Sequence, residues 1–340
     1  MRSKTRLILA LALAALCAPG NIVRTEIPNT MPAPEAIALD QVADASETGD
    51  PAWRVEGVWE YRADSLNFGG FSALLALDGN RLRAFSDRGF RFTFTAPDQI
   101  SADNDLREVA DQPLDPVYAD ELFDIEAATL DRVSGDYWLT FENLHAIQRY
   151  SAASEPRALK VFDAEVDWPL NAGAEALVRM ADGRFLILPE RGSEALLFAS
   201  DPTGLINDIQ MTDRAGELQR FDPRPVQIIN PAPGFVVTDM SQLPDGRLIM
   251  LMRDVQWGYP PFASLLAIAA LPEVEAETIR LQVALRFDGI IPSENYEALA
   301  LREETDGSVA VWVMADSNKS IMQRDLLVKL RFHPGTSVER

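Results

Sequence analysis

The sequence predicts an all-β protein with a β-propeller fold, from a repeated strand–turn–strand pattern, short apolar segments after glycine turns, and a scarcity of helical segments. One pattern recurs five times: an acidic or small polar residue, an apolar run, a tight turn, a second apolar run and a charged cluster. Repeats of this kind at roughly 50-residue spacing are typical of propeller blades. The five copies open, 49 to 63 residues apart, at Ser72, Glu126, Glu175, Thr238 and Glu297.

Each copy has the features of a hairpin. The turns are Asp78-Gly79, Ser134-Gly135, Asp182-Gly183, Asp245-Gly246 and Asp306-Gly307. Short apolar strands follow them at 82–85, 137–141, 185–188, 248–252 and 309–313. Glycine-containing turns between short apolar runs favour paired, buried strands. No alternating strand–helix units occur, which argues against a doubly wound sheet.

The number of blades depends on how the ring closes. Strand-like alternation begins at 53–61, and an apolar segment near 325–332 could pair with it and remove the open sheet edges. We expect six blades, the sixth built from these two segments or from the insertion at 200–230, with five blades as the alternative. Residues 114–122 form an acidic connector, and 201–220 form a polar insertion or an atypical blade.

The N-terminus has the features of a secretory signal. Basic residues in 1–6 precede an apolar run of ten at 7–16, which is too short to span a bilayer. We expect a signal peptide at 1–18, a proline-rich irregular leader at 19–52 and one propeller domain at 53–335. Lipid attachment at Cys17 is disfavoured by the bulky Leu16. The product is expected to be periplasmic or secreted, with no transmembrane segment.

Composition excludes several kinds of site. The chain carries 52 acidic and 31 basic residues, a formal net charge of −21, which becomes −24 if 1–18 are removed. Such a chain repels nucleic acid and anionic lipid. Cys17 is the single cysteine, so no disulfide is expected, and two histidines exclude a zinc site of clustered His and Cys. The charge serves solubility, or some carboxylates gather in a pocket and bind cations.

The acids that open the repeats are the candidate metal ligands. Starts of inner strands face the axis of a propeller, where several carboxylates repel one another unless they are neutralised. A hard divalent cation, calcium above all, suits oxygen ligands. The alternatives are structural pairing with arginines at the repeat ends, or shared protons. Asp239 is counted among the opening acids, and the predicted ligands are Glu126, Glu175, Glu297 and Asp316.

Other charged residues at the repeat ends are candidate substrate contacts and catalytic groups. A guanidinium binds phosphate or carboxylate through two hydrogen bonds, although each arginine has an adjacent acid as an alternative partner. His145 is a candidate acid or base oriented by Glu142, and a loop histidine without a role is the alternative. No G-x-S-x-G elbow, P-loop or dinucleotide fingerprint occurs, so no organic cofactor is expected. The predicted substrate contacts are Arg88, Arg191, Arg253, Asn143 and Asn318.

Taken together, several segments resemble the family named for the esterase-like activity of phytase. They are Gly69–Ser72, Asp124–Glu126, Phe141–Ile147, Asn171–Glu175, Asn295–Leu299 and Ala315–Asn318. The resemblance spans residues 69 to about 332 and departs from the pattern at Ser72 and at Thr238-Asp239-Met240. It implies an exported propeller that hydrolyses an ester or phosphoester, a small anionic substrate, at one end of the central channel. The alternative is a non-catalytic periplasmic ligand-binding or scaffold propeller, since one fold serves both uses.

Overall fold

The computed structural model describes most of the chain from residue 37 onward. The described residues are 37–63, 65, 67–100, 108–109, 115–116, 122–162, 166–168, 173–190, 192–204, 223–257, 259–318, 320 and 322–336. The predicted signal peptide and Arg191 lie outside these ranges, as do most residues of the segments 114–122 and 201–220. Within the described ranges, no helix is both long and apolar enough to cross a membrane.

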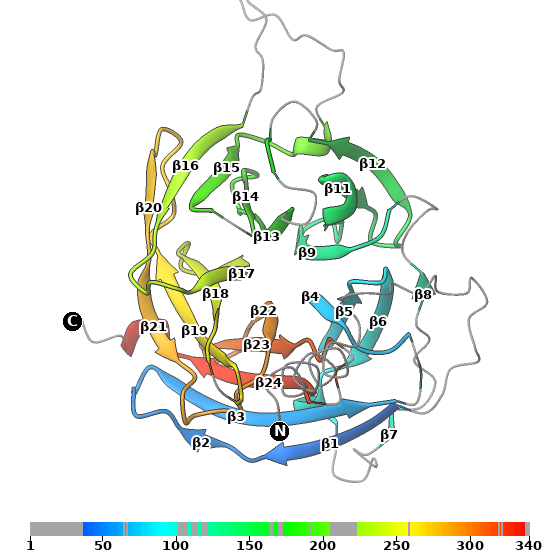
Figure 1. The fold of residues 1–340 in the computed structure, drawn as a ribbon, viewed down its shortest axis with the longest axis vertical. Coiled ribbons are helices and arrows are strands. Elements are labelled where there is room, and N and C mark those ends of the chain that lie inside the picture. The colour runs from blue at the N-terminus through cyan, green and yellow to red at the C-terminus, as the bar shows by residue number, and fades with distance from the viewer. Residues whose placement is uncertain are drawn as a thin grey trace, which may run out of the picture.

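Five sheets are arranged around a central axis as the blades of a propeller (Figure 1). The first blade contains β4 (Phe71–Leu77), β5 (Arg81–Ser86), β6 (Phe90–Thr95) and β8 (Asp115–Pro116). The second contains β9 (Ile125–Leu130), β10 (Tyr137–Phe141), β11 (Ala146–Tyr150) and β12 (Pro156–Val161). The third contains β13 (Ala174–Arg179), β14 (Phe185–Pro189), β15 (Glu194–Phe198), β16 (Arg224–Ile229) and β20 (Thr278–Arg280).

The last two blades complete the ring. The fourth contains β17 (Val236–Gln242), β18 (Leu248–Val255), β19 (Phe262–Ala269) and β21 (Gln282–Arg286). The fifth contains β22 (Tyr296–Glu303), β23 (Val309–Ala315), β24 (Asp325–Phe332), β3 (Trp53–Arg62), β1 (Ile37–Ala43) and β7 (Glu108–Val109), with β2 (Ser46–Glu47) also paired to β3. The described helices are short 3-10 turns: η1 (Pro97–Gln99), η2 (Glu142–Leu144), η3 (Pro202–Gly204) and η4 (Pro334–Thr336).

The all-β propeller prediction is confirmed, with five blades rather than the favoured six. The expected pairing of 53–61 with 325–332 does form, as β3 against β24. These two strands do not make a blade of their own, because β24 is already the third strand of the sheet that begins with β22 and β23. The other proposed source of a sixth blade supplies β16, which is the fourth strand of the third blade.

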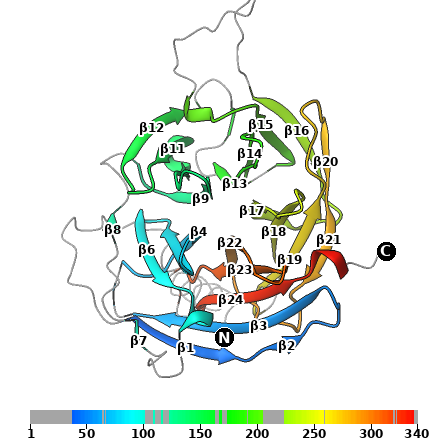
Figure 2. The same cartoon turned by 180° about the vertical axis from the view of Figure 1, so that it is seen from behind.

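The leader is more ordered than expected. An irregular segment was predicted over 19–52, but β1 pairs antiparallel with β3 and lies at the outer edge of the fifth blade (Figure 2). Ile37 and Leu39 are buried and alternate with the half-buried Ala38 and Asp40. This alternation fits a strand with one covered face, but it is brief and follows a proline-rich stretch, which hid it in the sequence.

The core lies between neighbouring blades. Each blade packs one face on the preceding sheet and one on the next, so the second strand of a blade is covered on both faces. Residues of β10, β14 and β23 are accordingly all buried. Burial on both faces explains why these strands read as continuous apolar runs instead of alternating patterns. The five inner strands, nearest the axis, are β4, β9, β13, β17 and β22 (Figure 1).

Candidate active site

Each inner strand contains a β-bulge close to its first residue. The register against the second strand shifts there. In four blades one residue of the inner strand has no partner opposite it, and in the second blade Glu126 and Ala127 together lie opposite Thr140. A bulge bends the strand and redirects the side chain of the extra residue. Because the five inner strands run side by side around the axis, the five bulges form a ring at one end, here called the inner ring. Its members are Ser72, Glu126, Glu175, Thr238 and Glu297.

The bulge of the fourth blade corrects one expectation. Asp239 was grouped with the opening acids, but Thr238 holds the bulge position. Asp239 is 1% exposed, and its carboxylate accepts the backbone N–H groups of Met240 at 2.7 Å and of Leu299 at 2.6 Å. Leu299 belongs to β22, so Asp239 joins the fourth blade to the fifth. Burial raises the pKa of Asp239.

A second ring lies beside the first, at the ends of the second strands of the blades or directly after them. In four blades, the N–H of its member donates to the carbonyl two residues before the bulge, at 2.8 to 3.0 Å. In the fourth blade, Arg253 pairs with Val236, two residues before Thr238. The members of this second ring are Asp87, Glu142, Glu190, Arg253 and Asp316. The two rings together are called the acidic end of the axis, and the fourth blade contributes a cation to it in place of an acid.

The four predicted cation ligands lie close enough to shift one another's pKa. Burial raises the pKa of Glu126, and the charges of Glu175, Asp124 and Glu142 raise it further. Burial and the charge of Glu297 likewise raise the pKa of Glu175. Glu126, Glu175 and Glu297 are 49 to 171 positions apart in the sequence. The propeller thus gathers into one place carboxylates that would be unfavourable there without protons or a counter-charge.

Glu297 and Asp316 form a carboxyl pair. Glu297 accepts hydrogen bonds from the Arg253 guanidinium at 2.7 Å, from the Asn295 amide at 2.7 Å and from Asp316. Burial and the charge of Glu297 raise the pKa of Asp316 well above its ordinary value. Burial raises the pKa of Glu297 as well, although Arg253, Asn295 and Asp316 act to lower it, so within the pair Asp316 has the greater tendency to hold a proton.

A second group of acids in the described residues has the geometry of a cation site. One carboxylate oxygen from each of Asp124, Glu126 and Glu142 can be chosen so that all three lie within 4.8 Å of one another. Oxygen donors at such separations fit a hard divalent cation. Glu126 was predicted as a ligand and Glu142 as a catalytic group, whereas Asp124 was not selected. The sequence does contain a signal for Asp124, because it stands two residues before Glu126 in a segment that resembles the family.

His145 lies at the end of η2, next to this group. Its φ of 44° is left-handed, and its N–H donates to the Glu142 carbonyl at 3.0 Å. Its Nδ1 is buried and has no hydrogen-bond partner in the described residues, and its ring meets Trp168 edge-on at 5.9 Å. Gly173 permits this arrangement, because a Cβ there would lie 3.0 Å from Glu142 and 3.2 Å from His145 Nδ1.

The remaining predicted contacts differ in position. Arg253 is in the second ring, while Arg88 is half-buried in the turn after β5. Asn143 accepts the N–H of Phe123 at 3.4 Å. Asn318 is exposed, and its N–H donates to Asp316 at 2.6 Å. Arg191 lies outside the described residues.

Solved structures similar to this chain include two enzymes and a β-propeller domain. A luciferin-regenerating enzyme is 11% identical over 88% of this chain and 91% of that chain, with a TM-score of 0.43. An endo-arabinase from Bacteroides thetaiotaomicron is 13% identical over 78% and 94%, with a TM-score of 0.45. The WD40 β-propeller domain of Doa1 is 10% identical over 89% and 95%, with a TM-score of 0.39. Identities this low carry no information about activity.

The sequence comparisons are more specific. Among curated proteins, no match to this chain was found. The phytase-like family, described as "Esterase-like activity of phytase", matches residues 66–319. This range contains all five inner strands and both rings of the acidic end. The chain therefore belongs to the phytase-like family.

Proposed function

We propose that this protein is a divalent-cation-dependent hydrolase that acts on an ester or phosphoester at the acidic end of the propeller. The observation that carries the proposal is the convergence of buried and half-buried carboxylates from three blades beside one guanidinium, Arg253, from a fourth. Ring symmetry alone does not require acids at these positions, since Ser72 and Thr238 occupy two of the five bulges. The esterase-like description of the family supports the same reaction class.

The cation is assigned first to Asp124, Glu126 and Glu142, whose oxygens come within 4.8 Å of one another. Calcium is the preferred ion, because it accepts several carboxylate oxygens in flexible geometry. A bound cation of this kind polarises the ester or phosphoryl oxygen and lowers the pKa of bound water. Glu175 lies within electrostatic reach of Glu126 and extends the ligand set toward the fifth blade.

The protein's own groups supply the proton and the anion contact. The raised pKa of Asp316 favours its protonated form, so it is the carboxyl group suited to protonate a leaving oxygen. Glu297 orients Asp316 and is itself held by Arg253. The guanidinium also has the charge that the transition state of ester or phosphoester cleavage requires. His145 is the second candidate acid or base, on the cation side of the site.

The test is hydrolysis by protein stripped of metal with a chelator and then given calcium, magnesium or manganese. The substrates are p-nitrophenyl acetate and p-nitrophenyl phosphate. We expect turnover only after a cation is restored, and a loss of at least about tenfold in Glu126→Gln. The matched control is Glu194→Gln, because Glu194 is an exposed residue at the start of β15. Absence of turnover with both substrates and all three ions would reject the proposal and favour the non-catalytic ligand-binding propeller.

A further inference from the structure

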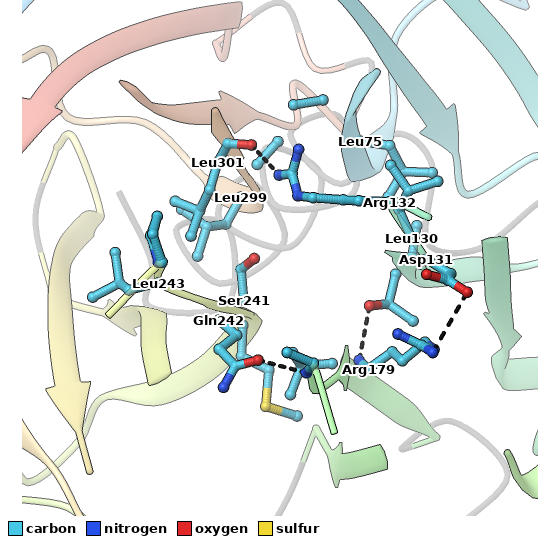
Figure 3. A pocket seen from close by; sticks show the side chains of 18 of the residues that line it. Leu75, Leu130, Asp131, Arg132, Arg179, Ser241, Gln242, Leu243, Leu299 and Leu301 are labelled. Carbon is cyan, nitrogen blue, oxygen red and sulfur yellow. Dashed lines mark hydrogen bonds and ion pairs between the residues drawn. The ribbon is translucent and has the colours of Figure 1, made fainter. Parts of the chain in front are cut away.

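The end of the axis opposite the acidic end contains a cavity of about 580 Å³. It lies between the last residues of the five inner strands and begins two or three residues beyond the bulges. Figure 3 shows side chains from several blades pointing into it. A cavity of this size is in the range that accepts small organic ligands. The predicted and proposed roles of the acidic end make no use of this pocket.

Arg132 supplies the positive charge of the pocket. It follows β9, and its guanidinium donates to the carbonyl of Leu301 in β22, so the side chain reaches from the second blade to the fifth (Figure 3). Arg132 stays accessible to solvent, and partial burial lowers the pKa of its guanidinium while Asp78 and Glu303 oppose that shift. In the described part of the chain, no carboxylate is within ion-pair distance of Arg132. Arg179, by contrast, is paired with Asp131 at 3.4 Å.

Arg132 has hydrogen-bond donors to spare. A guanidinium carries five N–H groups, and the Leu301 carbonyl is the one acceptor that the described residues offer to it. Ser241, on β17, also lines the pocket. Its hydroxyl makes no hydrogen bond within the described residues. A bound anion could therefore receive hydrogen bonds from two blades without displacing any existing pair.

The walls of the pocket are mixed, and apolar side chains form one part of them beside polar and charged groups. Leu75, Leu299 and Leu301 are 3% to 4% exposed, and Met240 is 2% exposed. These side chains come from the first, fourth and fifth blades. An apolar chain placed among them would be removed from water on several sides, which is favourable by about 0.8 kcal/mol for each methylene group.

We propose that this pocket binds a small organic anion, a monocarboxylate with a short aliphatic chain, with its carboxylate on Arg132 and its chain among the leucines. A carboxylate matches the two-pronged geometry of one guanidinium. A phosphate dianion fits less well, because Asp131 and Glu303 also line the pocket and would repel the second charge. The inference is independent of the proposed hydrolysis, since it concerns a different end of the axis.

Calorimetric titration of the whole protein with hexanoate, acetate and 1-hexanol tests both halves of the proposal. Hexanoate should bind at least about tenfold more tightly than acetate, which lacks the chain, and than 1-hexanol, which lacks the charge. In Arg132→Gln, hexanoate affinity should fall about tenfold, to the level of 1-hexanol. Arg157→Gln is the matched control, because Arg157 is exposed and pairs with the exposed Glu155 at 3.5 Å. Treatment with a chelator should leave hexanoate binding unchanged.

The series remains decisive even if Arg132→Gln fails to fold. The ligand comparison needs only the wild-type protein, and Ser241→Ala gives a second variant, with an expected threefold to tenfold loss for hexanoate and none for 1-hexanol. Equal affinity for hexanoate and 1-hexanol, wild-type affinity in a folded Arg132→Gln variant, or no heat at millimolar hexanoate would each overturn the proposal. Hexanoate binding that disappears with chelator would overturn it too, because it would assign the ligand to the acidic end.

Discussion

A carboxylate buried beside other carboxylates either keeps its proton or gains a counter-charge. Both solutions occur within one pair at the acidic end. Burial and Glu297 raise the pKa of Asp316, which favours its protonated form, whereas the ionised form of Glu297 is stabilised by hydrogen bonds from Arg253 and Asn295. Arg253 is thus the residue on which the ionisation of Glu297 depends.

Replacing Arg253 with Gln should destabilise the protein by about 3–5 kcal/mol at pH 7, because it leaves Glu297 buried without its cation. The loss should be smaller at pH 4.5, where Glu297 can take up a proton. Urea unfolding at both pH values measures the difference. Arg224→Gln is the control, since Arg224 pairs with Glu275 at the surface. Equal destabilisation at the two pH values would show that the role of Arg253 is packing and not charge.

Replacing Asp239 with Asn tests a contact between blades. The backbone N–H groups of Met240 and Leu299 both donate to this carboxylate. An amide offers one acceptor oxygen, so one buried N–H would lose its partner, at a cost of about 1–3 kcal/mol. Denaturant unfolding of Asp239→Asn measures the cost, with Asp44→Asn as an exposed control. A change below about 0.5 kcal/mol would contradict a structural role for Asp239.

At the scale of single strands, the sequence predicted the repeat openings well and the bulges not at all. Apolar runs and glycine turns are local signals, so they located the inner strands and the convergence of Glu126, Glu175 and Glu297 on one end. A bulge depends on the register against a partner strand, which no local pattern encodes. Asp239 was therefore grouped with the ring acids although Thr238 holds the bulge position. The catalytic and ligand roles assigned to these residues remain predictions.

The closure of the ring was also predictable only where it depends on local sequence. The strand at 53–61 and its pairing with 325–332 followed from their composition, but the sheet they belong to did not. That membership depends on β24 completing the hairpin begun by β22 and β23. Asp124 is a further case: its side chain becomes a possible ligand only because the second blade places it next to Glu142.

Lys329 connects the strands that close the ring. It lies on β24 with its side chain 5% exposed, 2.6 Å from Glu56 on β3 and 2.7 Å from Asp98 in η1. Asp98 follows the last long strand of the first blade, so this one cation joins the first blade to the fifth. We expect Lys329→Met to cost about 1–3 kcal/mol in the free energy of unfolding, because Glu56 and Asp98 lose a buried partner but keep Arg331 and Arg302 respectively.

The Lys329 prediction has an internal control. Adding Glu56→Gln to Lys329→Met removes one of the two carboxylates that lost Lys329 as a partner. The second substitution should therefore restore part of the lost stability. Urea unfolding of the single and double variants at pH 7 gives the coupling. If the double variant is less stable than the single variant by the full cost of Glu56→Gln alone, the two residues act independently and the proposed link between blades is wrong.

Across the whole molecule, the buried and paired carboxyls form two sets with opposite pH behaviour. At Glu56 and Asp98, burial raises the pKa, but hydrogen bonds from cationic side chains outweigh it and the pKa is lowered. These two carboxyls stabilise the folded protein at pH values above their ordinary pKa of about 4. That contribution is lost as the pH falls through their lower folded-state pKa values. The carboxyls of the acidic end have raised pKa values, so they stabilise the folded protein at pH values below their ordinary pKa. That contribution to stability is lost as the pH rises through their folded-state pKa values.

The opposition of these two sets predicts the pH profile of the cation-free protein. Its melting temperature should be highest near pH 4–5, between the acid-side loss of the paired carboxyls and the alkaline-side loss of the acidic end, and should decline toward pH 8. Calcium binds the deprotonated carboxylates, so it should oppose the decline and move the maximum to higher pH. At a calcium concentration a hundred times its dissociation constant, calcium should add about 2.7 kcal/mol to the free energy of unfolding.

Melting scans from pH 3 to 8, with calcium or with chelator, measure both effects. A chelated protein whose melting temperature rises steadily to pH 7 would contradict the raised pKa of Glu126, Glu175 and Asp316. A calcium effect that does not grow with pH would contradict the assignment of Glu126 and Glu175 as ligands, because protons and the cation compete for the same oxygens.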